Sequence, residues 1–246
     1  MENDSIEIKN LCKRFGGLTA VNDLSLEIGS GELFGLLGVN GAGKTTTIRM
    51  LSCLTKPDSG DALLGGKSIL TDSAAVKQMI NLSTQETAVA PKLTVRENLE
   101  FMAEIYGVSD PSAAMESVIK ELSLDSVLDR KAKTLSGGWQ RKVSIAMALV
   151  TSPKILFLDE PTLGLDVLAR RELWTAIRAL KSKMTIILTT HYLDEAEALC
   201  DRIAVMTGGC LRAVGTAQEL MALAGKDNFE DAFVEIAEKN GAVSNA

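Results

Sequence analysis

The segment 33–46 constrains the fold more strongly than any other part of the chain. It consists of a short apolar run at 33–37, then a glycine-rich loop that ends in Gly-Lys-Thr-Thr, then a helical stretch. In a GxxxxGK[ST] loop between a strand and a helix, glycines let backbone N–H groups point inward around an anion, where a Cβ atom would not fit. The segment therefore predicts a strand, a phosphate-binding loop and a helix, which together indicate an α/β protein.

Further apolar runs at 155–158, 185–188 and 203–206 are separated by helical stretches. Buried strands that alternate with helices are typical of a parallel sheet covered on both faces. The first 30 residues differ, because apolar and polar residues alternate there between glycine turns, which is the pattern of antiparallel strands. We therefore predict an α/β fold with a P-loop core, a parallel sheet and an N-terminal antiparallel β-subdomain.

An α-helical subdomain is predicted to be inserted into this core at about 90–155. The sequence Thr-Val-Arg-Glu at 94–97 is a capping box that opens a helix, and further helices are expected at 112–122 and from Ser136 onward. The residues expected on the buried side of the first helix are Leu99, Met102 and either Ile105 or Tyr106.

The chain is divided into one predicted domain at 1–225 and a tail at 226–246. The tail contains an amphipathic helix that is expected to end at Asn240-Gly241. The apolar positions of this helix are Phe229, Phe233 and Ile236. Such a helix packs either on the core or on a partner, and the sequence leaves both open.

Composition and charge exclude several functions. The 246 residues carry a formal net charge of −6, which argues against a general nucleic-acid-binding protein, and the basic segment 129–142 is interpreted as a solvated face around a phosphate site. No apolar run approaches the ~20 residues of a membrane-spanning helix, and no secretory signal is expected. The four cysteines form no CxxC motif, so we expect reduced thiols in a cytosolic protein and no metal site among them.

The glycine-rich loop carries the first group of candidate binding residues. Lys44 offers a positive charge to the β- and γ-phosphates, the Thr45 hydroxyl is placed to bind Mg²⁺, and the start of the helix adds a favourable dipole. The alternative, a glycine-rich turn with a chance lysine, does not explain the strand before the loop and the helix after it. The predicted nucleotide-binding residues are Gly38, Val39, Asn40, Gly41, Ala42, Gly43, Lys44, Thr45 and Thr46.

A second apolar strand ends in two carboxylates, Asp159 and Glu160. We expect Asp159 to hold Mg²⁺ through water and Glu160 to polarise a water molecule for in-line attack on a γ-phosphate. Two surface acids that cap a strand are the alternative. A strand, an acidic pair and a P-loop are together the parts required for phosphoryl transfer, which favours the first interpretation.

A second anion-binding surface is predicted at Ser136, Gly137 and Gly138, where a serine and two glycines begin a helix. An ordinary helix N-cap has the same geometry, so this motif alone does not separate binding from capping. His191 is the single histidine and follows a predicted parallel strand, at the edge where open α/β sheets bind their ligands. We favour a hydrogen bond from His191 to the γ-phosphate over a purely structural role.

Taken together, residues 5–225 resemble the ATP-binding-cassette (ABC) ATPase family. The family's motifs occur in order, from an aromatic residue before the first turn through Walker A, the Q-loop, the signature, Walker B and the D-loop to the switch histidine. They lie at Phe15, 38–46, Gln85, 135–139, 159–160, 163–166 and His191. Residues 164–166 and 228–233 resemble the ABC-2 or drug-efflux branch. Trp139 and Val39 stand where glutamine and proline are frequent in the family. Neither replacement removes a phosphate ligand, and we expect Trp139 to pack at the helix start.

The resemblance implies a RecA-like core that uses ATP and Mg²⁺ as cofactors. Phe15 would stack on adenine, Gln85 would sense Mg²⁺ and the attacking water, and Asp166 would communicate across a dimer in which each ATP lies between one P-loop and the other signature. The implied partners are a second ABC ATPase subunit and separate integral membrane permease subunits, docked at the Gln85 loop and the helical subdomain, with no nucleic acid.

The function implied by the resemblance is ATP hydrolysis that drives transport, with export as the expected direction. The protein would be cytoplasmic and peripheral on the inner face of the cell membrane, bound through the permease. The main alternative is a soluble ABC ATPase that powers another process, such as iron–sulfur cluster assembly. A GTPase or small kinase ranks last, because the chain has no NKxD base-reading motif and such a protein leaves residues 135–139 unexplained.

Overall fold

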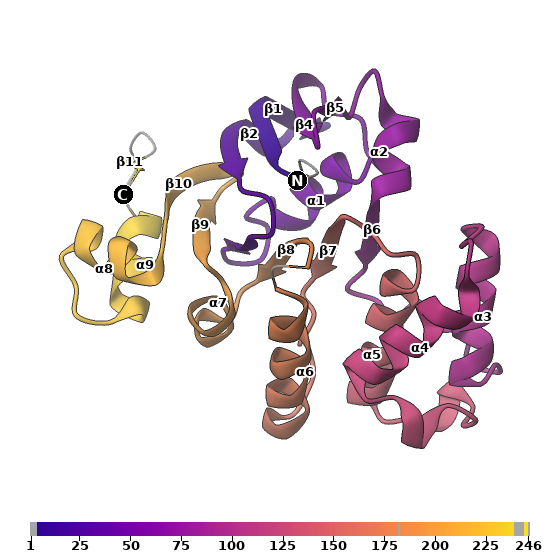
Figure 1. Ribbon diagram of the computed structural model, residues 1–246. Coiled ribbons are helices and arrows are strands. Elements are labelled where there is room, and N and C mark those ends of the chain that lie inside the picture. The colour runs from indigo at the N-terminus through magenta and orange to yellow at the C-terminus, as the bar shows by residue number, and fades with distance from the viewer. Residues whose placement is uncertain (1–3, 182, 239–243, 246) are drawn as a thin grey trace.

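The computed structural model describes residues 4–181, 183–238 and 244–245, and within them the chain folds into two β-sheets surrounded by helices (Figure 1). The N-terminal sheet has the strand order β2-β1-β4-β5, and its neighbouring strands are antiparallel. Its strands are β1 (Ile6–Phe15), β2 (Leu18–Ile28), β4 (Ser59–Leu64) and β5 (Lys67–Ser68). The antiparallel unit predicted from the alternating pattern is therefore present.

The second sheet has the strand order β11-β10-β9-β3-β8-β7-β6 in the described part of the chain. Strands β9, β3, β8 and β7 are parallel, as predicted, and β6, which was not predicted, pairs parallel with β7. Strand β10 is antiparallel to β9, because a two-residue turn at Gly208-Gly209 closes a hairpin where the chain would otherwise need a crossover. The strands are β3 (Leu33–Leu37), β6 (Ile80–Ser83), β7 (Ile155–Asp159), β8 (Thr185–Thr190), β9 (Arg202–Thr207), β10 (Cys210–Gly215) and β11 (Ser244–Asn245).

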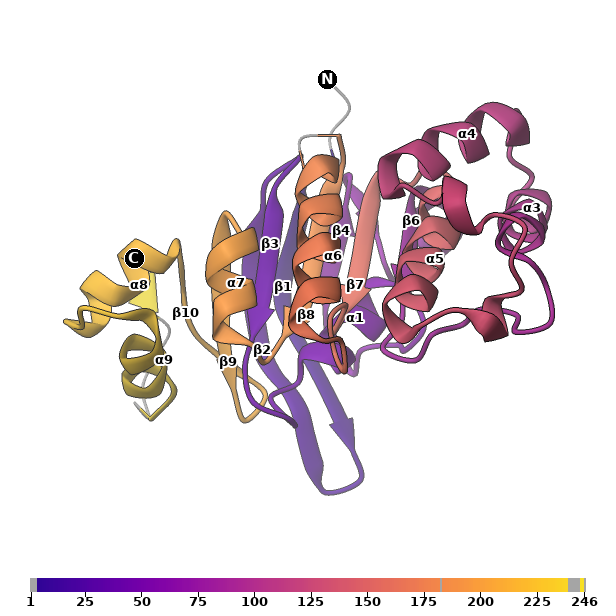
Figure 2. The same cartoon turned by 90° about the horizontal axis from the view of Figure 1, so that it is seen from below.

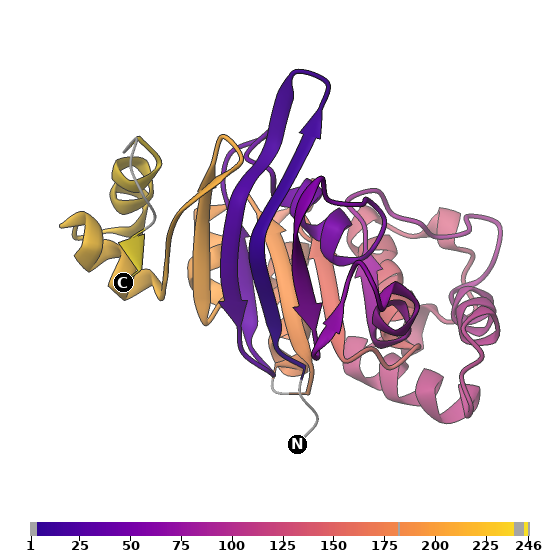
Figure 3. The same ribbon diagram turned by 90° about the horizontal axis from the view of Figure 1, so that it is seen from above.

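The parallel sheet is covered on both faces, which explains its continuous apolar runs. Figures 2 and 3 show β1 and β2 on one side of the parallel strands, with α6 (Val167–Leu180) and α7 (Leu193–Leu199) on the other. On β3, Phe34 and Leu36 join the core against the antiparallel sheet, whereas Leu33 joins the core against the helices. Every residue of β3 is buried, so neither face of this strand needs polar side chains.

Three helices lie between β6 and β7, in the segment that the sequence predicts to be helical. They are α3 (Val95–Ile105), α4 (Pro111–Leu122) and α5 (Gly137–Leu149), with 3-10 turns at Asp125–Val127 and Ala132–Thr134. Figure 2 shows them grouped beyond the β6 edge of the sheet. The predicted capping box of α3 is confirmed, since Thr94 Oγ1 accepts the Glu97 N–H at 3.1 Å and Glu97 Oε2 accepts the Thr94 N–H at 2.7 Å.

The predicted buried face of α3 is correct only in part. Leu99 is fully buried, together with Val95 one turn earlier, and Met102 packs against the same core. Ile105 and Tyr106 are 61% and 51% exposed, contrary to the prediction. Val95 and Leu99, four residues apart, fix the side of α3 that meets the core and α5. Ile105 lies about 120° around the helix from Leu99 and faces away from that side. Tyr106 stands at the C-cap, where α3 has ended.

The remaining helices pack on the sheets. Helix α1 (Lys44–Leu51) and α2 (Ser73–Met79) contribute to the core beneath the antiparallel sheet, and α8 (Ala217–Ala224) and α9 (Phe229–Glu238) pack beside β9 and β10. Phe229 and Ile236 are buried and Phe233 is partly buried, so the amphipathic helix packs on the core of its own chain. Its predicted end at Asn240-Gly241 lies outside the described residues. No helix in the described part of the chain has the length and apolar character to cross a membrane.

The capping box predicts a measurable stability effect. Thr94→Ala removes the oxygen that accepts the Glu97 N–H, so it should lower the free energy of unfolding by about 1 kcal/mol in urea denaturation. Thr175→Ala is the matched control, because Thr175 is an exposed interior residue of α6, where alanine has the higher helix propensity. An unchanged unfolding midpoint for Thr94→Ala would show that the cap does not stabilise α3.

Candidate nucleotide-binding site

The P-loop connects β3 to α1 and lines a cavity of about 500 Å³. Its backbone is tightly packed at Gly43, where φ is +100° and a Cβ atom would lie 2.4 Å from the carbonyl oxygen of Ala20, so only glycine fits. The cavity lining joins residues 40–46 of the P-loop to residues from distant segments. These are Phe15, Leu18, Ala20, Gln85, Glu160, Leu163 and His191. The structure therefore brings most of the predicted site residues together around one cavity.

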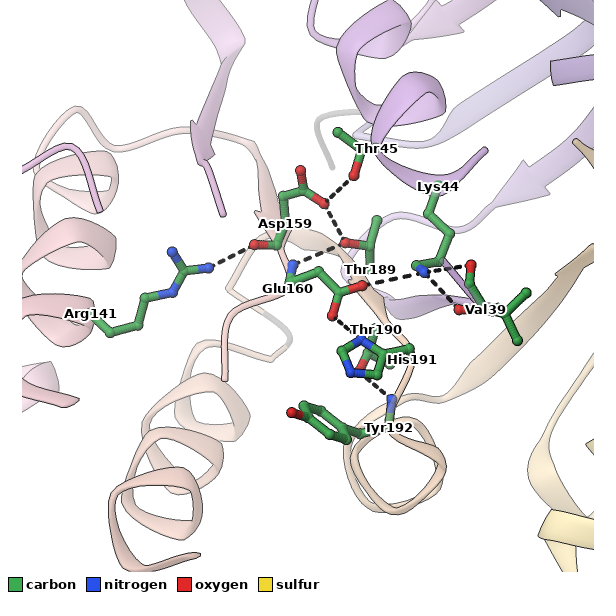
Figure 4. A network of polar contacts seen from close by, with 11 residues as sticks. Val39, Lys44, Thr45, Arg141, Asp159, Glu160, Thr189, Thr190, His191 and Tyr192 are labelled. Atoms are coloured by element: carbon green, nitrogen blue, oxygen red, sulfur yellow. Dashed lines mark hydrogen bonds and ion pairs between the residues drawn. The ribbon is translucent and has the colours of Figure 1, made fainter. Parts of the chain in front are cut away.

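Lys44 is buried at the centre of a polar network beside this cavity (Figure 4). Its Nζ donates to the carbonyl oxygens of Gly38 at 2.6 Å and Val39 at 3.3 Å, and it forms an ion pair with Glu160 Oε1 at 3.3 Å. A buried ammonium group needs such compensation, because its desolvation is costly. A ligand rich in oxygen atoms would compete for the same donor. Gly38 and Val39, which were predicted to bind the nucleotide, contact Lys44 through their carbonyl oxygens and do not line the cavity.

Asp159, at the end of β7, joins two other elements through a single oxygen atom. Oδ1 accepts hydrogen bonds from Thr45 Oγ1 on α1 at 3.0 Å and from Thr189 Oγ1 on β8 at 2.6 Å. A hydroxyl and a carboxylate beside a P-loop are oxygen ligands of the kind that Mg²⁺ prefers, and Mg²⁺ usually adds waters and substrate phosphates to them. Among the described residues, no group of three or more His, Cys, Asp or Glu could hold a metal alone. The Thr45 hydroxyl and the Asp159 carboxylate are donors that fit a cation shared with a nucleotide.

Glu160 follows directly and has a strained backbone. Its φ of +49° lies in the left-handed region, which costs a residue with a Cβ atom about 1–2 kcal/mol. Its N–H donates to Thr189 Oγ1 at 3.0 Å, and its Oε2 lies 2.7 Å from Nδ1 of His191. Such strain persists where the surroundings fix the geometry, and it is frequent at functional sites. Glu160 is therefore a buried carboxylate that is held at the edge of the cavity.

The other predicted residues at this cavity are more accessible. His191 contacts Glu160 on one side, and its ring centroid lies 4.2 Å from that of Tyr192. Gln85 is exposed, and Phe15 is 52% exposed with the Lys13 ammonium 5.4 Å from its ring. The lone histidine thus lies beside the candidate catalytic acid. The roles predicted for His191, Gln85 and Phe15 toward a nucleotide stay predictions.

The signature residues lie apart from the P-loop cavity. Ser136 and Gly138 line a separate hollow of about 220 Å³, together with the start of α6 at Asp166. Ser136 stands at the N-cap of α5, but its side chain makes no capping hydrogen bond. Capping of the helix therefore does not account for a hydroxyl group at this position. Asp166 caps α6 by accepting two backbone N–H groups. The starts of α5 and α6 are in close contact, since a Cβ atom at Gly138 would lie 2.9 Å from that of Ala169.

Comparison with known proteins identifies the family. Residues 21–163 match the family model described as ABC transporter. The chain is 39% identical to the linearmycin resistance ATP-binding protein LnrL of Bacillus subtilis, over 91% of this chain and 73% of that protein. It is 42% identical to the daunorubicin/doxorubicin resistance ATP-binding protein DrrA of Streptomyces peucetius, over 91% and 68%. The chain belongs to the ABC transporter family.

Solved structures confirm the ABC fold. An ATP-binding subunit of an ABC transporter superposes with a TM-score of 0.83 at 28% identity, over 95% of this chain and 99% of that chain. Human ATP-binding cassette sub-family A member 2 is 40% identical over 95% of this chain and 10% of its own length. The chain thus spans about a tenth of the length of the sub-family A relatives it matches. The predicted family and the α/β P-loop fold are confirmed, and the two resistance ATP-binding proteins among the relatives are consistent with the predicted drug-efflux branch.

The basic segment at 129–142 of this ABC chain is not simply a solvated face. Arg130, Lys131 and Lys133 are exposed, as that interpretation requires, but Arg141 and Lys142 are only 4% and 8% exposed. Both lie on α5 among its apolar residues, a helical position that could have revealed their burial.

Two features of α5 bear on the signature of this ABC chain. Lys142 Nζ pairs with Glu172 at 2.8 Å and lies 4.7 Å from the ring centroid of Trp139. Trp139 itself packs against the helical core at the start of α5, as predicted. Arg141 also belongs to the site, because it donates to the carbonyl oxygens of Gln85 and Asp159 beside the P-loop cavity. The sequence motifs did not predict this role.

Thr189 offers a direct test of the junction at the strand ends. Thr189→Val keeps the shape of the side chain and removes the hydroxyl that bonds both Asp159 Oδ1 and the Glu160 N–H, so the free energy of unfolding should fall by about 1–3 kcal/mol. Thr19→Val on β2 is the control, because the Thr19 side chain has no hydrogen bond to any described residue. This change should alter stability by less than about 0.5 kcal/mol. Equal effects of the two changes would contradict the importance of this junction.

Proposed function

We propose that this chain is an ATP-binding and ATP-hydrolysing component of an ABC transporter and that it works as a pair of cassettes. The observation that carries the proposal is the separation of its two anion-binding surfaces, since the P-loop lines one cavity and the signature residues Ser136 and Gly138 line another. Both surfaces lie at helix starts, where backbone N–H groups favour anions. One nucleotide in the P-loop cavity would therefore meet the signature of a second copy.

The cavity lining supports the placement of Mg-ATP in this pair. Lys44 and the P-loop amides would bind the β- and γ-phosphates, and the half-exposed ring of Phe15 would stack on the adenine. Thr45 and Asp159, already joined by a hydrogen bond, would supply oxygen ligands to Mg²⁺, with Gln85 beside them. Bound Mg²⁺ would offset the charge that develops on the phosphate oxygens.

Glu160 is the proposed general base for the attacking water. Its two carboxylate oxygens contact Lys44 and His191, which hold it at the cavity edge. His191 comes from the next strand end and would reach the γ-phosphate from there.

Transport across a membrane is the proposed task of the ATPase cycle. The relatives LnrL and DrrA are named as resistance ATP-binding proteins, which supports export of a compound by a permease partner. Phe101 and Ile105 on α3 and Tyr106 at its C-cap are exposed apolar side chains of the kind that suits contact with such a partner. The cassettes would then lie on the cytoplasmic face of the membrane, held there by the permease.

The assignment of Glu160 is tested by Glu160→Gln. The amide cannot accept the proton of the attacking water, so ATP turnover should fall by roughly 10²-fold or more while ATP binding is kept. Dimers that depend on ATP should accumulate and be visible by light scattering. Glu197→Gln changes an exposed glutamate on α7 and serves as the control with normal turnover. Normal hydrolysis by Glu160→Gln would exclude Glu160 as the base.

The paired arrangement is tested by Ser136→Arg. A long cation at the start of α5 would block the second anion surface, so hydrolysis and dimer formation should be lost. Binding of a fluorescent ATP analogue to the P-loop of the monomer should keep its Kd within about twofold, because the two surfaces line different cavities. Weaker binding by the monomer would show that both motifs serve one site within a single chain.

A further inference from the structure

Arg141 lies in the second turn of α5, and its guanidinium group is surrounded by backbone carbonyl groups. Its Nε donates to the oxygen of Pro161 at 2.8 Å. Its Nη2 donates to that of Asp159 at 2.7 Å (Figure 4). Its Nη1 donates to the oxygen of Gln85 at 3.2 Å and also to that of Thr84. One side chain thus connects the signature helix to two segments of the P-loop cavity.

The charge of this side chain is compensated by neutral acceptors. Burial lowers the pKa of Arg141 to about 10, and the charges of the nearby Asp159, Glu195 and Glu160 oppose this shift, so the group stays charged at neutral pH. A buried cation is tolerated only when hydrogen bonds compensate it, and here each of the three guanidinium nitrogens donates to a carbonyl oxygen. Because a guanidinium is a planar fork and an ammonium is a single point, lysine could not hold both segments at once.

Two of the carbonyl oxygens that accept hydrogen bonds from Arg141 belong to the backbone around the strained residue Glu160. These two, on Asp159 and Pro161, flank Glu160 in the chain, and Glu160 has a φ of +49°. Arg141 therefore restrains the backbone on both sides of Glu160, while Thr189 restrains its N–H. A left-handed conformation of this kind persists only while its surroundings enforce it. Loss of the fork would let the Glu160 backbone relax and turn its carboxylate away from the cavity.

We propose that Arg141 is a positioning residue that couples the signature turn of α5 to the Glu160 carboxylate of the same chain. Ser136 and Arg141 lie on one helix, about 7.5 Å apart along its axis at a rise of about 1.5 Å per residue. When the signature binds a nucleotide held by the other cassette, a shift of α5 would move Arg141 and the two segments that it contacts. Each site would then reach full activity only when the other is filled. The inference rests on the proposed function, since it requires two cassettes.

The decisive variant is Arg141→Lys, which keeps the charge and removes the fork. ATP affinity of the monomer and KM should stay within about twofold of the unaltered chain, whereas kcat should fall at least about tenfold and the Hill coefficient for ATP should approach 1. Arg178→Lys is the matched control. The Arg178 guanidinium also donates to a backbone carbonyl, that of Ala198, but it lies outside the cavity, and this change should leave the kinetics as they were.

The outcomes separate this inference from the proposed function. If the unaltered chain hydrolyses ATP, Glu160→Gln does not, and Arg141→Lys keeps its kcat and Hill coefficient, the coupling is wrong and the function stands. No hydrolysis by the unaltered chain would overturn the function itself. A fall in kcat that is matched by equal losses of ATP affinity and Tm would mean that Arg141 only stabilises the fold, and would also overturn the coupling.

A second measurement avoids any change at Arg141. Hydrogen–deuterium exchange is followed in Glu160→Gln with Mg-ATP, with and without the further change Ser136→Arg. The coupling predicts that amides at 84–88 and 160–163 are protected in the dimer and lose that protection when the signature is blocked, while P-loop amides stay protected in both. Equal protection of 84–88 and 160–163 in the two proteins would show that the signature does not control these segments.

Discussion

The carboxylate of Asp159 joins elements that are far apart in the chain, and the arrangement of the whole site depends on that junction. Strands β3, β8 and β7 are adjacent and parallel, with Leu37 paired to Thr190 and Asp159 paired to Thr189. Parallel strands end at the same edge of a sheet, so the P-loop, the acidic pair and the histidine loop emerge side by side. One oxygen of Asp159 then bonds the hydroxyls of Thr45 and Thr189, which requires all three strands to keep their register.

This geometry explains why so much of the candidate site could be predicted from the sequence. Several site residues directly follow a buried strand or begin a helix, and such positions are visible in the sequence as the end of an apolar run. Lys44, Glu160 and His191 were all found in this way, and the structure places them in contact or at one cavity. The capping box at Thr94 is local in the same sense, because its partners lie within four residues.

What could not be predicted depends on contacts between distant segments. Arg141 belongs to a basic segment that reads as a solvated face, but its acceptors lie 18 to 57 residues away in the chain and enclose it. The apolar period of α3 shows that the helix has a buried side but not how far along the helix the core extends, so the predicted burial of Ile105 or Tyr106 is wrong. Strand β10 runs antiparallel to β9 because a glycine turn joins the two strands. The apolar pattern of a strand does not show in which direction its neighbour runs.

The buried cationic side chains around the site differ in the groups that neutralise or solvate their charge, and these differences fit different roles in the ATP cycle. Lys44 is paired with Glu160, a charged partner that a phosphate oxygen can replace at comparable electrostatic cost. Lys142 is paired with Glu172 and lies near the ring of Trp139, within the separate hollow of the signature. Arg141 is held by neutral carbonyl oxygens, which gain no charge and no proton when a nucleotide binds or is hydrolysed. Its contacts can therefore persist through the ATP cycle while those of Lys44 are exchanged, so a fixed connection links two surfaces whose ligands come and go.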